Sequence, residues 1–341
     1  MYQTNKTPPP DSRLAARIGE GVLQEKLKDY QKAKEATLEI LPALNDSTSP
    51  LKKHYTRIEE CGTYLVFRVF YTVEQTRVIR ANLCKKRLLC DLCALRTSAM
   101  RVQAFIPKFE QVLSDNPDLE PYLVTFTVKN GPDLLERYNH LTGSYTKLIK
   151  NRTRDLSCKR SNTIYRFVAG GTMQVEIKIG SGSDLWHSHI HSIIMLPGGL
   201  FDVARKIRKG KDVYVPYDFE NSLRAEWSAI TDDSHMVDVR RILVESDEQR
   251  IGAICEAHKY PLKPGNLTPE QRIYAAEKLH AKRMYRSFGC FYGVDINEDL
   301  IDSIEAELEL LPYVDLVYSY NNKGYVLKEV TDYGNYEKVA V

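Results

Sequence analysis

The histidines of one short segment are the side chains whose type and spacing most directly suggest chemistry. His187, His189 and His191 alternate along W-H-S-H-I-H-S-I-I-M-L, residues 186–196, which then becomes apolar. On a strand, residues two apart share a face, so the three imidazoles would project in one direction. Neighbouring imidazoles are suitable ligands for a divalent metal ion. The alternative interpretation is a half-buried strand whose histidines meet solvent or hydrogen-bond partners.

A carboxylate on the preceding segment could complete a metal site. In residues 172–179, the apolar side chains alternate with Gln, Glu and Lys, and Glu176 is on the polar face. If this strand pairs with the histidine strand, Glu176 approaches His189 and His191 as an oxygen ligand. Two histidines and one carboxylate suit Mn²⁺ or Mg²⁺ acting as a Lewis acid on phosphate. His187 is the alternative third ligand, and a solvated strand glutamate is the alternative interpretation of Glu176.

A glutamate, a tyrosine and a lysine follow one another in E-A-H-K-Y-P-L-K, residues 256–263. Glu256 and Tyr260 are four apart, so a helix would place them on one face, although Pro261 disturbs the helix before Lys263. A tyrosine hydroxyl is a weak nucleophile near neutrality unless a cation or a metal-bound substrate assists it. Lys263 could stabilise a phenolate or a phosphate, and Glu256 could accept a proton. The pattern also fits a surface helix end with a half-buried tyrosine.

Four cysteines, Cys61, Cys84, Cys90 and Cys93, occur within 33 residues. The Cys-x2-Cys pair is usual for structural zinc, which takes four tetrahedral N or S ligands, whereas the other two spacings are less usual. A set of buried free thiols is the alternative, since disulfides are not expected in a reducing compartment.

Composition describes a soluble globular protein. The chain has 341 residues, 43% hydrophobic and 27% charged, which allows two domains or one large domain with appendages. No apolar run approaches the roughly 20 residues of a membrane span, and residues 1–12 are too polar for a signal peptide. We therefore expect a cytoplasmic protein. The net charge of +3 says little, but bases gather in 76–104, 147–160 and 205–211 and acids in 295–309. Such segregation suits a polyanionic partner, or else consists of ordinary solvated faces.

Periodicity predicts an α+β fold with a mainly antiparallel sheet. Alternation predicts strands over 122–128, 163–168, 172–179, 189–196, 236–243 and 315–318. Helical spacing predicts helices over 14–44, 87–105, 133–150, 201–209, 218–230, 248–260, 269–285 and 298–311.

The order and joint spacing of these motifs resemble the HUH endonucleases, and more closely the replication initiators (Rep proteins) of small bacterial rolling-circle plasmids. T-F-T at 125–127 resembles the first family motif, H-S-H-I-H at 187–191 the second, and E-x3-Y-x2-K at 256–263 the third. The cysteine segment 84–96 and the preceding Cys61-Gly62 also resemble this family, and the likeness covers about residues 58–292. Ser188 departs from the pattern, because the family usually has proline there.

The resemblance implies an HUH-type central antiparallel sheet flanked by helices. Together with composition and periodicity it divides the chain into four segments: a disordered lead-in and helix (1–50), a cysteine-bearing segment with a zinc-like site (51–118), the HUH nicking domain (119–292) and a C-terminal α/β extension (293–341).

The resemblance also implies an activity: metal-dependent nicking and joining of single-stranded DNA that initiates plasmid rolling-circle replication. Tyr260 would form a 5′-phosphotyrosine, Lys263 would stabilise charge, and Glu256 would activate water for termination. His189 and His191, with Glu176, would hold Mn²⁺ or Mg²⁺, while His187 would be an outer contact. The implied partners are the plasmid origin, as a single-stranded or cruciform nick site, a host helicase and the replication polymerase, in the bacterial cytoplasm. The expected DNA contacts are Lys85, Lys86, Arg87, Arg96, Arg101, Lys150, Arg152 and Arg154.

Two alternatives are a related enzyme, either a conjugative relaxase or a single-tyrosine transposase, and a zinc-stabilised DNA-binding regulator without catalysis. The cysteine segment and Glu256 argue against the first. The second requires that protein with Mn²⁺ leaves a single-stranded origin uncut.

Overall fold

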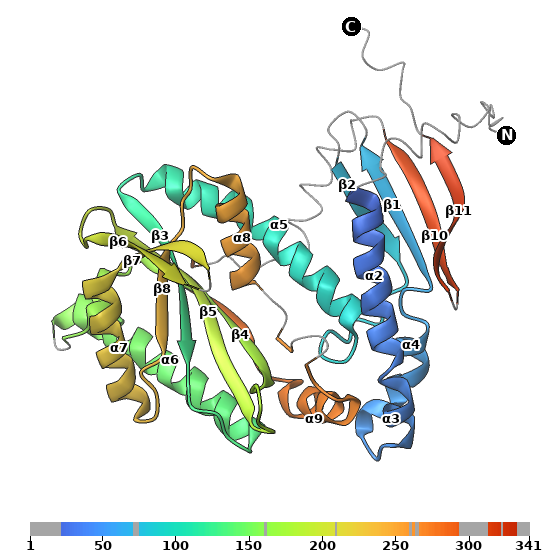
Figure 1. The fold of residues 1–341 in the computed structure, drawn as a ribbon, viewed down its shortest axis with the longest axis horizontal. Helices are drawn as coiled ribbons and strands as arrows, with labels where there is room; N and C mark the ends of the chain where they lie inside the picture. Colours follow the sequence, from blue (N-terminus) through green and yellow to red (C-terminus); the bar gives the residue numbers. More distant parts are fainter. Residues whose placement is uncertain are drawn as a thin grey trace, which may run out of the picture. The chain divides into compact units, whose positions relative to one another are not determined.

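The computed structural model describes residues 22–70, 75–159, 162–208, 210–258, 261–262, 266–292, 313–321 and 323–332 (Figure 1). These residues belong to two compact units. The central unit comprises residues 97–297, and the terminal unit combines residues 1–96 with 298–341. The division falls within helix α5 (Asp91–Asp115). None of the helices in the described ranges is long and apolar enough to cross a membrane.

The central unit contains a five-stranded sheet in the order β8-β3-β5-β4-β9, in which every neighbouring pair is antiparallel. Its strands are β3 (Leu119–Thr127), β4 (Gly170–Ile179), β5 (Trp186–Pro197), β8 (Val237–Arg241) and β9 (Tyr285–Gly289). The prediction of an α+β fold with an antiparallel sheet is confirmed. The middle strand, β5, carries the histidines and is buried along almost its whole length.

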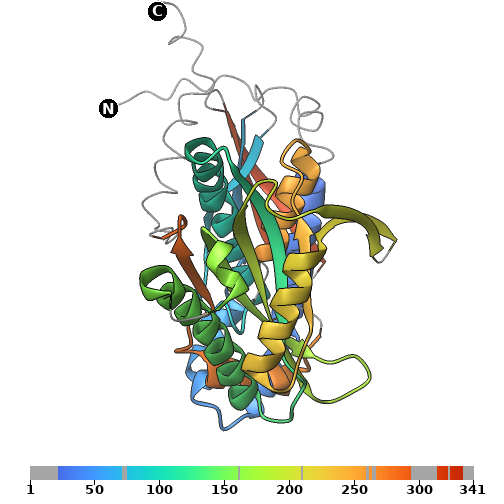
Figure 2. The ribbon, with the colours of Figure 1, turned by 90° about the vertical axis from the view of Figure 1, so that its left-hand side faces the viewer.

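Helices α6 (Leu134–Cys158) and α7 (Tyr217–Thr231) cover one face of this sheet, as Figure 2 shows. The Asp133 side chain caps α6 by accepting a hydrogen bond from Glu136 N, and apolar side chains recur along its buried side. The Tyr145 hydroxyl lies 3.2 Å from Ser192 Oγ of β5. From α7, the Trp227 indole donates to the Thr127 carbonyl at 2.9 Å.

Helices α5 and α8 (Asp247–Ala257) pack on the opposite face. Phe105 and Phe109 of α5 join Ile254 of α8 in one apolar cluster with Ile193 and Met195 of β5. Because alternate strand residues share a face, the histidines at odd positions of β5 lie on the same face as this cluster. One end of that face is therefore apolar and the other is polar.

The helix predicted over 201–209 is wrong. The segment forms a hairpin of β6 (Val203–Arg208) and β7 (Lys211–Pro216). Gly210, with φ of +75°, lies in the tight turn, where a positive φ costs glycine little. The β-branched residues of β7, Val213 and Val215, also favour a strand.

Other expectations differ from the structure in type or bounds, one lies wholly outside the described residues and one lies partly outside them. Residues 164–167 form a short 3-10 helix rather than a strand, because the Thr163 hydroxyl caps it by accepting from Tyr165 N. Helix α5 begins at Asp91 rather than at residue 87, and α9 (Pro269–Leu279) ends early, so that β9 follows. The helix expected over 298–311 and residues 14–21 lie outside the described residues.

The terminal unit contains a second antiparallel sheet, in the order β11-β10-β1-β2. Its strands are β1 (Tyr64–Phe70), β2 (Gln75–Ala81), β10 (Val314–Asn321) and β11 (Gly324–Asp332), and its helices are α2 (Val22–Leu38), α3 (Leu41–Asp46), η1 (Pro50–His54) and α4 (Tyr55–Glu59). Pairing of β1 with β10 joins chain segments that are far apart in sequence, and Arg68 of β1 makes a two-pronged ion pair with Asp315 of β10.

Candidate functional site

Strand pairing brings Glu176, His189 and His191 together, and we call these three residues the triad. Glu176 of β4 lies directly opposite His189 of β5 in the antiparallel register. Both imidazole Nε2 atoms lie 2.8 Å from the same carboxylate oxygen, Glu176 Oε2. All three side chains are buried, and their ligand atoms lie within 4.8 Å of one another. Two nitrogens and one oxygen thus face a common point, which is a donor set that fits a divalent metal ion.

The pKa shifts of Glu176 and His189 also fit metal binding. Burial opposes ionisation of Glu176, but the hydrogen bonds of His189 and His191 outweigh it, so the pKa of this carboxyl lies below its usual range. Burial lowers the pKa of His189 despite the neighbouring carboxylate. An ionised carboxylate and a neutral imidazole are the forms in which these groups ligate metals.

The ring of His191 is oriented from the other side by Thr125 of β3. Thr125 lies opposite His191 in the β3–β5 register, and its Oγ1 is 3.3 Å from His191 Nδ1. A contact at Nδ1 leaves Nε2 directed at Glu176, which is how outer contacts commonly hold a ligating imidazole. The T-F-T segment therefore has a physical role beside the histidines.

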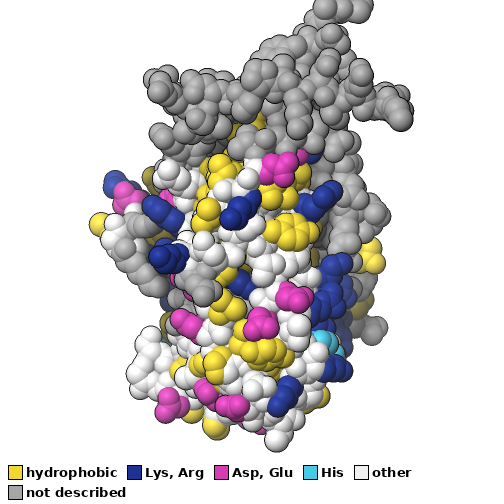
Figure 3. Space-filling view, turned by 90° about the vertical axis from the view of Figure 1, so that its right-hand side faces the viewer, with side chains coloured by type: hydrophobic (Ala, Val, Ile, Leu, Met, Phe, Trp, Pro, Cys, Tyr) yellow, Lys and Arg dark blue, Asp and Glu magenta, His cyan; other side chains and the backbone are white. Residues whose placement is uncertain are grey.

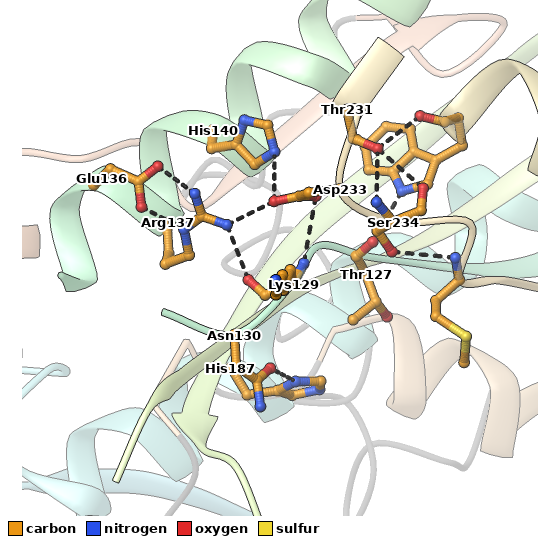
Figure 4. A network of polar contacts seen from close by, with 12 residues as sticks. Thr127, Lys129, Asn130, Glu136, Arg137, His140, His187, Thr231, Asp233 and Ser234 are labelled. Atoms are coloured by element: carbon orange, nitrogen blue, oxygen red, sulfur yellow. Dashed lines mark hydrogen bonds and ion pairs between the residues drawn. The ribbon is translucent and has the colours of Figure 1, made fainter. Parts of the chain in front are cut away.

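His187 has a different set of contacts. Its Nδ1 lies 2.7 Å from Asn130 Oδ1, as Figure 4 shows. In the same view Asp233 accepts hydrogen bonds from Arg137 and Lys129 N, which tie the start of α6 to the loop after α7. Burial, followed by the charge of His189, lowers the pKa of His187 to about 4. His187 therefore lies beside the triad, whereas Glu176 contacts both of its histidines.

Arg101 is an expected DNA contact that the fold places beside the triad. Its guanidinium donates to Gln174 Oε1 at 3.0 Å and lies over the Tyr285 ring. Gln174 is fully buried, lies opposite His191 in the register and shares the face of Glu176. Alternation in the sequence placed Gln174 on the same strand face as Glu176 but indicated no role for it in the site.

Tyr260 and Lys263 lie outside the described residues, but the chain on either side of Tyr260 is described. The Ser98 hydroxyl of α5 donates to the His258 carbonyl at 2.6 Å. Ile177 N donates to the Pro261 carbonyl at 2.8 Å, and Ile177 immediately follows Glu176. The segment that carries the tyrosine is therefore attached to α5 on one side and to the triad strand on the other.

Glu256 lies in the last turn of α8, one residue before the buried Ala257. It lines a cavity of about 660 Å³ together with Tyr214 of the hairpin and Arg240 of β8. A carboxylate at a solvent-accessible cavity can accept a proton from water.

The basic residues of α6 divide into two kinds. The Arg152 guanidinium donates to the carbonyls of Val168 and Ala169, at 2.6 and 3.0 Å. Lys150 and Arg154 are exposed and line a hollow of about 450 Å³ along the helix. Arg152 therefore serves the fold, whereas the other two present charge to solvent.

In the terminal unit, Cys61, Cys84, Cys90 and Cys93 form a buried group that we call the cysteine cluster. Their closest Sγ atoms are 3.5–3.6 Å apart, near the roughly 3.8 Å edge of a tetrahedron with Zn–S bonds of about 2.3 Å. Backbone N–H groups of Cys84 and Cys93 point at the sulfurs of Cys61 and Cys90. Hydrogen bonding to the neighbouring thiols and burial raise the pKa of Cys61. Four thiolates this close together would repel one another unless a cation lay among them.

Three basic residues follow Cys84 directly in the chain. Burial lowers the pKa of His54, and the positive charges of Lys86, Lys53 and Arg57 nearby lower it further. Figure 3 shows Lys and Arg side chains along the right-hand edge of the face in view, beside a histidine, and others at its left-hand edge and centre. Lys85 and Arg87 are exposed, whereas Arg96 donates to the Val78 carbonyl at 2.8 Å.

Comparison with known families and proteins provides an independent observation. A family model described as "Replication protein" matches residues 75–315, which include the triad and the 256–263 segment. The chain is 27% identical over 281 residues to Protein rep of Streptococcus pneumoniae serotype 2 (strain D39 / NCTC 7466), covering 80% of this chain and 78% of that protein. It is 25% identical over 150 residues to Protein rep of Staphylococcus aureus, covering 43% of this chain and 60% of that protein. No solved structure matches the chain.

Proposed function

This chain belongs to the replication-protein family, and from that premise we propose that it initiates plasmid rolling-circle replication by nicking and rejoining one DNA strand through a tyrosine. The observation that supports this most directly is the convergence of Glu176, His189 and His191 on one point. The strand that supplies Glu176 also holds the carbonyl of Pro261, the residue after Tyr260.

The triad would hold Mn²⁺ or Mg²⁺, which when bound supplies Lewis-acid polarisation of the scissile phosphate. Thr125 keeps His191 Nε2 directed at the triad. Arg101, fixed by Gln174 beside the triad, would bind a phosphate oxygen of the same strand. Together these side chains would position the phosphate and neutralise its charge.

Tyr260 would carry out the cleavage. Its hydroxyl would give its proton to water, and its oxygen would form a bond to phosphorus as the bond to the 3′ oxygen breaks. The 3′ oxygen would leave as a free hydroxyl, taking up a proton, and the 5′ phosphate would stay on the tyrosine. Lys263 would stabilise negative charge near the nucleophile. The free 3′-hydroxyl would then prime a host polymerase, behind a host helicase that opens the duplex.

Glu256 would take a proton from water for the terminating cleavage, and the cavity along α8 offers space for water. With one tyrosine and one carboxylate, the second cut would release the enzyme from the DNA.

The exposed cations would bind the phosphate backbone of the origin. These are Lys85 and Arg87 in the terminal unit, with the half-buried Lys86 between them, and Lys150 and Arg154 in the central unit. Arg96 and Arg152 are not included, because their guanidinium groups bond to backbone carbonyls. The cysteine cluster would hold structural zinc.

The test is incubation of the purified full chain with single-stranded fragments of its own replicon, with and without Mn²⁺. A covalent adduct should form only with the metal and only on fragments that contain the origin. Peptide mass mapping should then place a 5′-linked nucleotide on Tyr260. If no fragment is cut and no adduct forms, the proposed nicking is wrong, and the protein is instead a zinc-stabilised DNA-binding regulator without catalytic activity.

A further inference from the structure

The terminal unit buries a lysine beside the cysteine cluster. Lys34 of α2 is 1% exposed, which is unusual for an ammonium group. Its Nζ donates to the carbonyl of Cys61 at 2.7 Å and to the carbonyl of Glu59 at 2.5 Å, and it lies over the Tyr320 ring. Within the described ranges no carboxylate lies at ion-pair distance from it, and the Glu59 carboxylate acts on it from further away.

A buried ammonium group needs a negative charge nearby, because carbonyl oxygens replace its water hydrogen bonds but do not neutralise it. The cysteine cluster can provide that charge. Four protonated thiols carry none, whereas four thiolates around one Zn²⁺ carry a net charge of −2. The position of Lys34 is therefore favourable when the cluster is loaded with metal and unfavourable when it is an empty set of thiols.

The local structure holds Lys34 in this position. Thr37, one turn further along α2 and fully buried, accepts a hydrogen bond from Asp91 N at 3.0 Å and lies 3.7 Å from Cys90 Sγ. The Tyr325 hydroxyl donates to the carbonyl of Gly62, the residue after Cys61. Helix α2 therefore contacts both halves of the cluster, the Cys61 turn through Lys34 and the Cys90 turn through Thr37.

We infer that Lys34 is the fixed counter-cation of the cysteine cluster and strengthens its hold on zinc. This inference rests on the proposed zinc site and adds a residue that carries no metal-binding atom. It also gives α2 a function, because the helix supplies the charge that the metal-loaded cluster requires.

The test measures zinc affinity of the full chain by competition with a chromophoric chelator. Lys34→Met keeps most of the apolar stem and removes the charge, and should weaken zinc binding by about 10- to 100-fold, the usual effect of losing an outer contact of a metal site. Lys26→Met is the matched control: Lys26 belongs to the same helix and bonds to the Thr76 carbonyl, away from the cysteines. It should bind zinc as the wild type does.

Thermal unfolding separates this role from ordinary packing. Zinc should raise the Tm of the wild type by more than that of Lys34→Met, whereas the metal-free variant should be at least as stable as the metal-free wild type. Lys34→Gln, a second neutral variant, should behave in the same way, and Lys34→Arg should retain much of the zinc affinity.

Equal zinc affinity of Lys34→Met and wild type overturns the counter-cation role alone. So does a variant that loses stability equally with and without metal. If the wild type itself takes up neither zinc nor cobalt, the proposed zinc site is wrong, and the inference that rests on it is wrong with it.

Discussion

Ile177 N donates a hydrogen bond to the Pro261 carbonyl at 2.8 Å, and Leu262 continues this contact as a parallel bridge to Ile177. Ile177 follows a triad residue, and Pro261 follows the tyrosine of the E-x3-Y-x2-K segment. Two segments that are far apart in sequence are thus joined by backbone hydrogen bonding, which is independent of side-chain identity. Mutations at the triad or the tyrosine should therefore change chemistry with little change in this attachment.

Replacing Tyr260 by Phe should abolish covalent attachment to a single-stranded origin oligonucleotide, because no oxygen remains to attack phosphorus. Binding of duplex origin should be unchanged. Denaturing gels of the adduct test this. Tyr292→Phe is the control, since Tyr292 is 82% exposed and follows in the same chain region. An adduct on Tyr260→Phe would move the nucleophile to Tyr274, Tyr285 or Tyr292.

Loss of a triad ligand should weaken metal binding more than loss of His187. We expect His189→Ala to reduce Mn²⁺ affinity and nicking by at least about 100-fold, beyond the effect typical of an outer contact. His187→Ala should stay within the roughly 10- to 100-fold loss of an outer contact, because His187 bonds to Asn130. Calorimetric titration with Mn²⁺ measures both. Equal losses in the two variants would place His187 among the ligands.

Neutralising Arg101 should slow nicking without removing the metal. Arg101→Gln should lower the cleavage rate by about 10²- to 10³-fold, as loss of one preorganised donor to phosphate does. Lys108→Gln is the control on the same helix, because Lys108 bonds only to Gln111 among described side chains. Single-turnover rates with saturating Mn²⁺ are the measurement. A rate change that more Mn²⁺ restores would instead assign Arg101 to metal binding.

Mutations of the two kinds of basic residue on α6 should have different effects, one on DNA binding and the other on protein stability. Removing Lys150 and Arg154 should lower the salt dependence of duplex binding by about one unit of slope for each charge, with little loss of stability. Arg152→Met should instead reduce the free energy of unfolding by about 1–3 kcal/mol, since the buried Val168 loses the donor to its carbonyl and the Ala169 carbonyl keeps only the Cys290 N–H. Fluorescence anisotropy across a salt series and urea unfolding measure the two effects.

His258 should make stability depend on pH. Burial lowers its pKa to about 4 in the folded protein, below the value of about 6.5 for an unfolded chain. Between these values only the unfolded chain binds the proton, so the free energy of unfolding should fall as the pH falls from about 6.5 to 4, by up to roughly 3 kcal/mol. Above pH 6.5 this contribution is constant.

The control for this effect is His258→Leu, measured by urea unfolding of metal-free protein from pH 4.5 to 7.5. The variant lacks the titrating group, so its deficit relative to wild type should shrink as the pH falls. A deficit that is the same at every pH would show that His258 does not carry the effect.

Much of the central sheet could be predicted because its strands have strong local signals. Alternation in 122–128, 172–179 and 189–196 corresponds to β3, β4 and β5, and helical spacing anticipates α6 and α7. Elements with weak local signals were wrong or missed. Residues 201–209 read as a helix because their charges obscure the alternation, whereas Gly210 and the partner strand make a hairpin.

Local periodicity was sufficient to place His189 and His191 on one face, because side chains two apart on any strand point the same way. Residue type and spacing were also sufficient to identify four cysteines and a glutamate–tyrosine–lysine segment as candidate site residues. Which residue joins the two histidines was decided by cross-strand register, which sets Glu176 opposite His189, whereas His187 contacts Asn130. Some arginines bond to backbone carbonyls while others are exposed, and Lys34 is buried at the cysteine cluster. These differences likewise arise from contacts between segments that are distant in sequence. Such contacts leave no trace in spacing, since they depend on how elements pack and not on the order of residues within them.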